Sequence, residues 1–388
     1  MEESWQNIEE CDAVMGHTYG CADTGHQVVQ MHSMAWEEVR MLTGKTKAII
    51  QVAATYIGTV VGAGFASGLS IMQFFTIYGG FGVIGMLIST ALFIWIGTKM
   101  MLLARRIRAY SYQELNMYLF GPVIGRAANA LSFIVLFGVT SVMLSGTGSI
   151  FEERFGLPFQ LGILLSVFLT YLVMTKNLDG VLAVNVIVVP MMLFFSMIIS
   201  VVYLDMNGLL QTLAIQQQQL NDWQWMISPF AYTALNFATL QAVLVPLGSE
   251  IEDESVLRWG GLLGGIGLGF MLLTSHAAMN SLMPVILLFD IPMAEVIADF
   301  GWLMQVLFLV VVYGEIFTTL VGNVFGMSRQ IHSIRPLPHN VIAVTLLFAC
   351  FLISQFGFAP LLSSLYDIFG YMGLFLLVIL MVKRLPQT

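Results

Sequence analysis

The fold is decided by the stretch Gly58-Thr59-Val60-Val61-Gly62-Ala63-Gly64-Phe65-Ala66-Ser67-Gly68, which lies in the middle of an apolar run from Ala48 to Gly79. This run is too long for one upright crossing of a bilayer, which needs about 20 residues. Its four central glycines also disfavour a continuous helix, since each costs roughly 1 kcal/mol relative to alanine. The pattern predicts two half-helices joined by unwound backbone. Lipid tolerates such a break only where the freed backbone groups line a cavity or meet a ligand, so the stretch indicates a binding site.

The composition is that of an integral membrane protein. Of 388 residues, 58% are hydrophobic and 10% are charged, and the mean hydropathy is +0.85. The three cysteines do not make a disulfide framework. No basic stripe occurs outside the membrane flanks, so the sequence predicts a lipid bilayer and a small molecule as partners and no nucleic acid.

Residues 1–47 are polar and acidic, and they are predicted to form a disordered cytoplasmic tail. An alternative is that synthesis starts at Met41, immediately before the first basic residues. The spacing of Cys11, His17, Cys21 and His26 matches no zinc pattern, so no metal site is predicted here. The acidic character of the tail excludes a secretory signal.

Ten spans follow the tail. They cover 48–79 (broken), 82–104, 124–150, 158–175, 180–204, 225–248, 256–279, 302–325, 339–358 and 361–382. Pro190 lies inside the fifth span and is expected to kink it. In this arrangement 14 of the 15 lysines and arginines fall on one side, with Arg154 as the exception. Positive residues mark the cytoplasmic side, so both termini are predicted to be cytoplasmic in a bacterial plasma membrane.

The spans form two nearly equal halves, 48–204 and 225–382. Each half has five spans, so the two halves must cross the bilayer in opposite senses. Short amphipathic segments at 111–121 and 292–301 both end in Phe-Gly, one on each side of the membrane. The sequence therefore predicts a five-plus-five inverted repeat, as in known transporters. By this symmetry the sixth span is expected to be broken like the first. No glycine marks a break there, and a continuous helix is the alternative.

Polar residues in spans six and eight are the candidate partners of the broken first span. Tyr232 and Asn236 lie in the middle of span six, and Asn236 offers both hydrogen-bond donors and an acceptor. In span eight, Glu315, Thr318 and Thr319 share one helical face, which Gly322 and Asn323 continue.

An acidic group near the middle of a bilayer costs roughly 2.5–3.5 kcal/mol on insertion scales, and no lysine or arginine lies deep enough in the membrane to pair with Glu315. Glu315 must be protonated, hydrated in a cavity or close to a cation. The alternative is a structural carboxyl that is hydrogen-bonded to a neighbouring helix. The threonine hydroxyls, together with carbonyls freed at the break, can form an oxygen cage for Na⁺.

Two further polar features have more than one interpretation. Asp367 in span ten follows Ser363 and Ser364 and is either a gate residue or a structural pairing residue. Small residues form a stripe in span three, which favours close helix packing over ligand contact. The stripe consists of Gly138, Ser141, Ser145 and Gly148.

Three stretches carry a family resemblance, namely Tyr56-Ile-Gly-Thr-Val-Val-Gly62-Ala-Gly64-Phe65-Ala-Ser67-Gly68, Val245-Pro-Leu-Gly248 and Glu315-Ile-Phe-Thr-Thr319. From about Lys45 to the C-terminus, the chain resembles the YkvI-like bacterial membrane proteins. That family is related to the amino acid–polyamine–organocation superfamily, and the resemblance implies a LeuT-type fold. It also implies that the break at Gly62-Ala63-Gly64 receives a substrate carboxylate.

The chain departs from its relatives at the ion site. Some proton-coupled relatives place a lysine in the fifth span, where this chain has only Asn185 and Pro190. Thr318 and Thr319 satisfy the sodium-coupled pattern of paired hydroxyls, but Glu315 is additional. The resemblance thus leaves Na⁺ and H⁺ open as coupling ions, and it leaves the substrate open.

The leading hypothesis is an all-α, ion-coupled secondary transporter of a small amino acid or related carboxylate. The substrate would meet Gly62, Ala63, Gly64, Phe65, Ala66, Ser67, Gly68, Tyr232 and Asn236. Val61, Glu315, Thr318 and Thr319 would couple the ion, with no cofactor and no metal other than sodium. The alternative is a non-transporting receptor of the same fold, similar to germinant-receptor subunits. An enzyme is not predicted, because the spans contain no nucleophile–base pair and no set of metal ligands.

Overall fold

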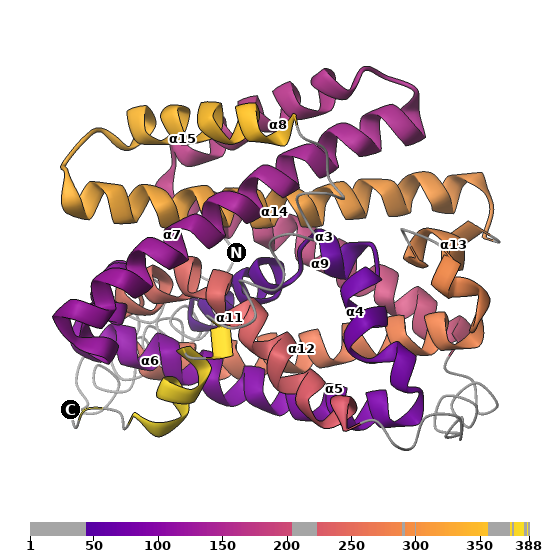
Figure 1. Cartoon of the computed structure of the whole chain (residues 1–388), viewed down its shortest axis with the longest axis horizontal. Coiled ribbons are helices and arrows are strands. Elements are labelled where there is room, and N and C mark those ends of the chain that lie inside the picture. Colours follow the sequence, from indigo (N-terminus) through magenta and orange to yellow (C-terminus); the bar gives the residue numbers. More distant parts are fainter. Residues whose placement is uncertain are drawn as a thin grey trace, which may run out of the picture. The chain divides into compact units, whose positions relative to one another are not determined.

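The computed structural model describes residues 44–203, 223–288, 292–298, 300–355, 373–374, 376–383 and 386. The described residues form helices and contain no β-strand (Figure 1). Six of the helices are long and apolar enough to cross a membrane, and three shorter apolar helices accompany them. The prediction of an all-α chain with many membrane spans is confirmed.

The helices agree closely with the predicted spans. In chain order they are 44–60, α3 (Ala63–Ala66), α4 (Leu69–Phe74), η1 (Thr76–Tyr78), α5 (Gly80–Leu92), η2 (Phe93–Gly97), α6 (Thr98–Ile107), α7 (Tyr112–Phe155), α8 (Phe159–Met174), α9 (Asn177–Tyr203), α11 (Gln224–Glu250), α12 (Glu254–Ser281), η4 (Val285–Leu288), α13 (Pro292–Ala298), α14 (Trp302–Ile334) and α15 (His339–Ser354). Residues 1–43 of the predicted tail and most of the tenth span lie outside the described residues, and 44–47 belong to the first helix.

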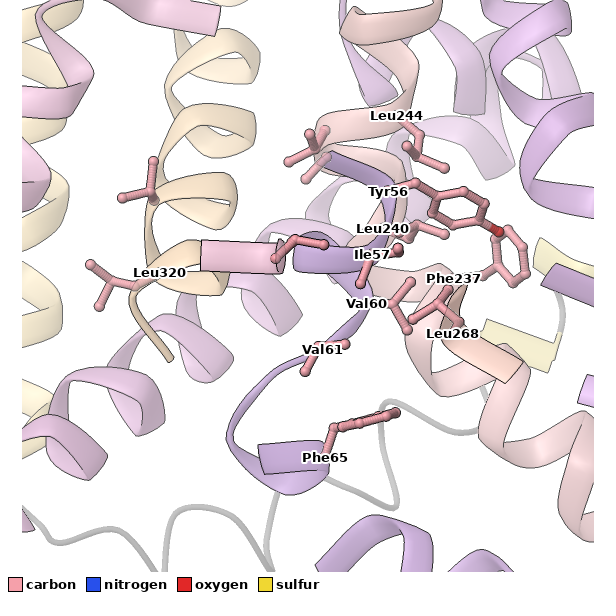
Figure 2. Close-up of a cluster of buried hydrophobic side chains, with 14 of the residues drawn as sticks. Tyr56, Ile57, Val60, Val61, Phe65, Phe237, Leu240, Leu244, Leu268 and Leu320 are labelled. Atoms are coloured by element: carbon pink, nitrogen blue, oxygen red, sulfur yellow. The ribbon is translucent and has the colours of Figure 1, made fainter. Parts of the chain in front are cut away.

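The first span is broken where its glycines predict. The helix over 44–60 ends, Val61 and Gly62 are not helical, and the short helices α3 and α4 follow. Gly68 precedes α4 with a φ of 81°, a left-handed conformation that glycine adopts without steric penalty. Figure 2 shows the chain leaving the helix at Val61 and turning into the short helix that carries Phe65.

The expected break in the sixth span is not observed. The helix α11 runs without interruption from Gln224 to Glu250. Its prolines, Pro229 and Pro246, lie towards its two ends, and its only glycine is Gly248 near the C-terminus. The interior therefore keeps residues that sustain a helix, and the symmetry argument was wrong at this point.

The helices form two groups. One group, which we call the bundle, contains the helix over 44–60 with α5, α6, α11 and α12. The other group, which we call the scaffold, contains α7, α8, α14 and α15. In Figure 1, α8 and α15 lie beside each other along one edge, next to α7 and α14. The helix α9 packs against both α12 and α14 and thus links the two groups.

Glycines on α12 allow the bundle to pack closely. A Cβ atom built on Gly264 would lie 2.8 Å from the Tyr56 ring, so the backbones of α12 and of the helix over 44–60 are in near contact. On a second face of α12, Gly265 similarly meets Ile94 of η2. The Tyr56 hydroxyl donates a 2.7 Å hydrogen bond to the Phe93 carbonyl, at the π-helical turn η2. This contact ties the first span to the second.

Two glycines support the predicted repeat. Gly121, with φ 75° and ψ −179°, lies between the short helix that starts at Tyr112 and the long remainder of α7. Gly301, with φ 87° and ψ 167°, precedes α14 and follows the short helix α13. The two residues end the matching Phe-Gly segments and have nearly the same conformation. The division into halves at 48–204 and 225–382 remains a prediction that this similarity favours.

The Gly264→Ala variant tests the close packing. Overpacking of a tight contact costs about 1–3 kcal/mol, and the Tyr56 ring is held by its hydrogen bond to Phe93. We therefore expect a clearly lower thermal unfolding midpoint for the purified protein. Gly44→Ala is the control, because nothing lies within 4 Å of the position that its Cβ would take. Equal midpoints for the two variants would contradict the packing account.

Candidate functional site

A cavity of about 70 Å³ lies at the break in the first span. Five of the predicted substrate residues line it, namely Gly62, Gly64, Phe65, Tyr232 and Asn236. Thr319 of the predicted ion set lines it as well. The unbroken helix α11 still brings Tyr232 and Asn236 to the cavity, so a break in the sixth span is not needed for this contact.

Sequence reasoning missed several residues that line this cavity. They are Thr59, Val60 and Ser70 from the first span, Val139 and Met143 from α7, and Leu235 and Thr239 from α11. Thr239 lies three residues after Asn236 and follows the same face of α11. Helical periodicity in span six could therefore have identified it. The two α7 residues are apolar and carried no signal.

Ser67 and Gly68, which were predicted to meet the substrate, do not line the cavity. The Ser67 carbonyl instead accepts a 3.0 Å hydrogen bond from the Met293 backbone N–H at the start of α13. A Cβ on Gly68 would collide with the Met293 side chain at 2.7 Å. These two residues connect the broken span to α13. Ala63 and Ala66 belong to α3, and the structure does not describe their side chains.

The side chains in the cavity are partly held by their own helix. The Asn236 amide Nδ2 donates to the Tyr232 carbonyl at 2.8 Å, and the Thr239 hydroxyl donates to the Asn236 carbonyl at 3.0 Å. The Tyr232 ring packs edge-on against Phe75, with ring centroids 5.0 Å apart. This packing fixes α11 against the second half of the broken span.

A cluster of oxygen atoms lies next to the cavity. The Thr319 hydroxyl donates to the Val61 carbonyl at 2.8 Å. The Thr318 hydroxyl lies 2.9 Å from the Gly58 carbonyl and 2.9 Å from the Glu315 carbonyl. The last four carbonyls of a helix have no partner within it, so the end of the helix over 44–60 leaves these acceptors available. Together the three residues of α14 and the end of the first half-helix bring five oxygens into one place. We call these five atoms the threonine–carbonyl cluster.

Asn185 of α9 lies beside the same carbonyls. A Cβ on Gly58 would be 1.8 Å from the Asn185 Oδ1 atom, so this amide approaches the backbone where only glycine leaves room. The amide nitrogen donates to the Val181 carbonyl at 2.7 Å. The Oδ1 atom is buried and has no hydrogen-bond partner in the described part of the chain. Asn185 therefore presents an unpartnered amide oxygen next to Gly58, one of whose atoms belongs to the cluster.

The structure divides the predicted ion-coupling set. The main-chain oxygen of Glu315 belongs to the threonine–carbonyl cluster, but its side chain lines a different cavity, together with residues of α9 and α12. Thr318, Thr319 and Val61 come together as predicted. Asp367 and its two serines lie outside the described residues, so their role stays a prediction. In the small-residue stripe, Gly148 packs against the Phe159 ring of α8, which supports the packing interpretation there.

No family model matches the chain. The chain is 40% identical over 340 residues to the membrane protein YkvI of Bacillus subtilis (strain 168), and the match covers 87% of this chain and 96% of YkvI. The chain belongs to the YkvI family of membrane proteins. It is also 25% identical over 326 residues to the protein YyaD of the same organism, which covers 84% of this chain and 94% of YyaD. The YkvI resemblance seen in the sequence is confirmed.

Solved structures with the same fold are transporters. A Na⁺-coupled sialic acid symporter matches with a TM-score of 0.66 at 13% identity, covering 87% of this chain and 79% of that one. The nucleobase-cation-symport-1 family transporter Mhp1 matches with a TM-score of 0.51 at 13% identity, covering 84% of this chain and 77% of that one. A mutant Eremococcus coleocola manganese transporter matches with a TM-score of 0.52 at 12% identity, covering 86% and 76%. At these identities the likeness shows the fold alone, which is LeuT-like.

A double-mutant cycle at Gly58 and Asn185 tests the geometry of the cluster. Gly58→Ala places a methyl group against the Asn185 amide, and we expect a loss of about 1–3 kcal/mol in stability from the overlap. Asn185→Ala removes the colliding atoms, so Gly58→Ala should cost much less in that background. Thermal or denaturant unfolding of the four purified proteins measures the coupling. An equal cost of Gly58→Ala in both backgrounds would mean that the two side chains do not meet.

Proposed function

We propose that this protein is an ion-coupled secondary transporter that moves a small amino acid or related carboxylate by alternating access. The observation that carries the proposal is the cavity at the broken first span, which shares Thr319 with the threonine–carbonyl cluster. A ligand site and a candidate cation site are thus in direct contact. The sialic acid symporter, whose fold this chain shares, is described as Na⁺-coupled.

The backbone at the break suits a carboxylate. The first N–H groups of a helix have no partner within it, and α3 begins directly after Gly62. Gly62 and Gly64 both line the cavity and add no side chain that would cover these N–H groups. On the opposite wall, no described residue donates to the Asn236 Oδ1 atom, which can accept a hydrogen bond from the ammonium group of an amino acid.

The size of the cavity restricts the substrate. A volume of about 70 Å³ holds roughly five water-sized groups, at about 10–15 Å³ for each. The ligand must therefore be small, or the cavity must widen when it binds. The first condition favours a small amino acid over a sugar or a nucleobase.

The threonine–carbonyl cluster is the proposed Na⁺ site. Its two hydroxyl and three carbonyl oxygens are neutral hard ligands, which suit a small monovalent cation. A bound cation would replace the hydrogen bonds that the hydroxyls donate and would hold α14 against both carbonyls of the first half-helix. Since Gly62 follows this half-helix directly, cation binding would favour the state in which the substrate cavity is formed. H⁺ is the alternative coupling ion.

Uptake by reconstituted protein tests the function. We expect vesicles that contain the full chain in a bacterial lipid mixture to accumulate a labelled small amino acid when an inward Na⁺ gradient is imposed. An inward H⁺ gradient without Na⁺ distinguishes the two coupling ions. Vesicles without protein and a dissipated gradient are the controls. Ligand-induced thermal stabilisation without uptake under either gradient would reject transport and favour a receptor of the same fold. From the lysine and arginine distribution we also infer that the protein lies in a bacterial plasma membrane with both termini in the cytoplasm.

Thr319→Val tests the assignment of the cation site. The substitution keeps the volume of the side chain but removes the hydroxyl that bonds to Val61. We expect the Na⁺-dependent rise in the unfolding midpoint to fall to a small fraction of the wild-type value, because only ligands bound to the native state stabilise it. Thr345→Val is the matched control, since its exposed hydroxyl bonds only within α15. A wild-type response to Na⁺ in Thr319→Val would remove this residue from the site.

A further inference from the structure

A second, smaller cavity of about 30 Å³ lies on the other side of Phe65, whose side chain borders both cavities. It is enclosed by α9, α12 and α14, and Met293 of α13 also contributes to its wall. Three of the lining residues carry oxygen atoms, and they come from three different helices. They are Ser196 of α9, Ser275 of α12 and Glu315 of α14. Every other lining residue is aliphatic, aromatic or methionine.

The three polar side chains are buried without partners. Glu315 is 5% exposed, and its Oε2 atom has no hydrogen-bond partner in the described part of the chain. Ser196 and Ser275 are 6% and 5% exposed, and neither hydroxyl makes a hydrogen bond to another described residue. Among the described residues, no lysine, arginine or histidine lines the cavity. A buried carboxyl without a partner is either protonated or compensated by a nearby positive charge, and hydroxyl oxygens beside it are suitable ligands for a cation.

The volume and the charge define a suitable occupant. A space of about 30 Å³ holds roughly two water-sized groups, at about 10–15 Å³ for each, so an ion fits more readily than an amino acid. The three side chains supply one negative charge and two neutral hydroxyls. A monovalent cation would neutralise this charge, whereas a divalent cation would leave a net positive charge in an apolar wall. Ca²⁺ also requires six to eight oxygen ligands, and Mg²⁺ keeps several waters, for which the cavity has no room.

We propose that this cavity, which we call the Glu315 cavity, is a second cation site that binds one Na⁺ ion. The Glu315 carboxylate is its charged ligand, and the Ser196 and Ser275 hydroxyls are its neutral ligands. The site is separate from the threonine–carbonyl cluster, because it uses the side chain of Glu315 and the cluster uses only the main-chain oxygen of that residue. It therefore adds a second ion to the proposed coupling.

The position of the site links it to the substrate. Phe65 contacts both cavities, so movement of α3 towards one of them changes the other. The same residue, Glu315, has its carboxyl in one cation site and its carbonyl in the other. A cation in the Glu315 cavity would fix this part of α14 in the arrangement that the threonine–carbonyl cluster needs. The existence of the site itself does not depend on transport.

Equilibrium binding of radioactive ²²Na⁺ to the purified full chain tests the proposal. With both cation sites present, we expect two Na⁺ ions per wild-type chain. Glu315→Gln should bind one ion fewer than the wild type, because the amide supplies no charge. Glu295→Gln is the matched control, since Glu295 is exposed on α13 and lies outside the cavity. Choline chloride at equal ionic strength corrects for non-specific binding. The same Na⁺ stoichiometry in Glu315→Gln and wild type would overturn the proposal.

If Glu315→Gln does not fold, substitutions of the two serines test the same site. Ser196→Ala combined with Ser275→Ala removes both hydroxyls and leaves the carboxyl and the apolar wall. We expect the affinity for one Na⁺ ion to fall about tenfold or more, and unchanged affinity for every ion would overturn the proposal. Thr319→Val acts on the other cation site only, so it separates the two assignments. If Glu315→Gln binds one Na⁺ ion fewer than the wild type but the wild type shows no uptake, the second cation site is supported and the transport function is rejected.

Discussion

The contact between two threonine hydroxyls of α14 and two carbonyls of the first span is the interaction on which the rest of the structure depends. Thr318 and Thr319 meet the Gly58 and Val61 carbonyls at 2.9 and 2.8 Å. These acceptors are available only because the helix ends at residue 60, and in lipid an unpaired carbonyl costs several kcal/mol. The break and the threonines therefore require each other. Through them the bundle is joined to the scaffold at the point where the cavity forms.

This interaction also explains why the neighbouring residues are small or polar. Gly58 has no side chain, so the Asn185 amide can approach the backbone there. A Cβ atom built on Gly62 would lie only 3.3 Å from the Thr319 hydroxyl oxygen. Phe65, three residues after Gly62, lines both the cavity at the break and the Glu315 cavity. One broken segment thus shapes two cavities and one oxygen cluster. Such a segment is suited to link the occupancy of one site to that of another, because each ligand acts on the same few residues.

The sequence predicts much of the fold because membrane spans depend on local properties. Apolar length defined the helices, and four glycines located the break near Val61. The expected symmetry between the halves misled at α11, because that helix has no glycine before Gly248 and runs without interruption. Helical periodicity grouped Glu315 with Thr318, but it could not show that the carboxyl and carbonyl of Glu315 lie in different sites. Ser196 and Ser275 lie in long apolar helices, and only the structure shows that they line one cavity with Glu315.

The central claim is that the cavity at the broken span and the threonine–carbonyl cluster act as one linked site. Thermodynamic linkage tests it most directly, with no need for a transport assay. Calorimetric titration would measure the affinity for a small amino acid with and without saturating Na⁺, and the affinity for Na⁺ with and without the amino acid. The account predicts that each ligand strengthens the binding of the other by the same factor. Two affinities that are each independent of the other ligand would contradict it.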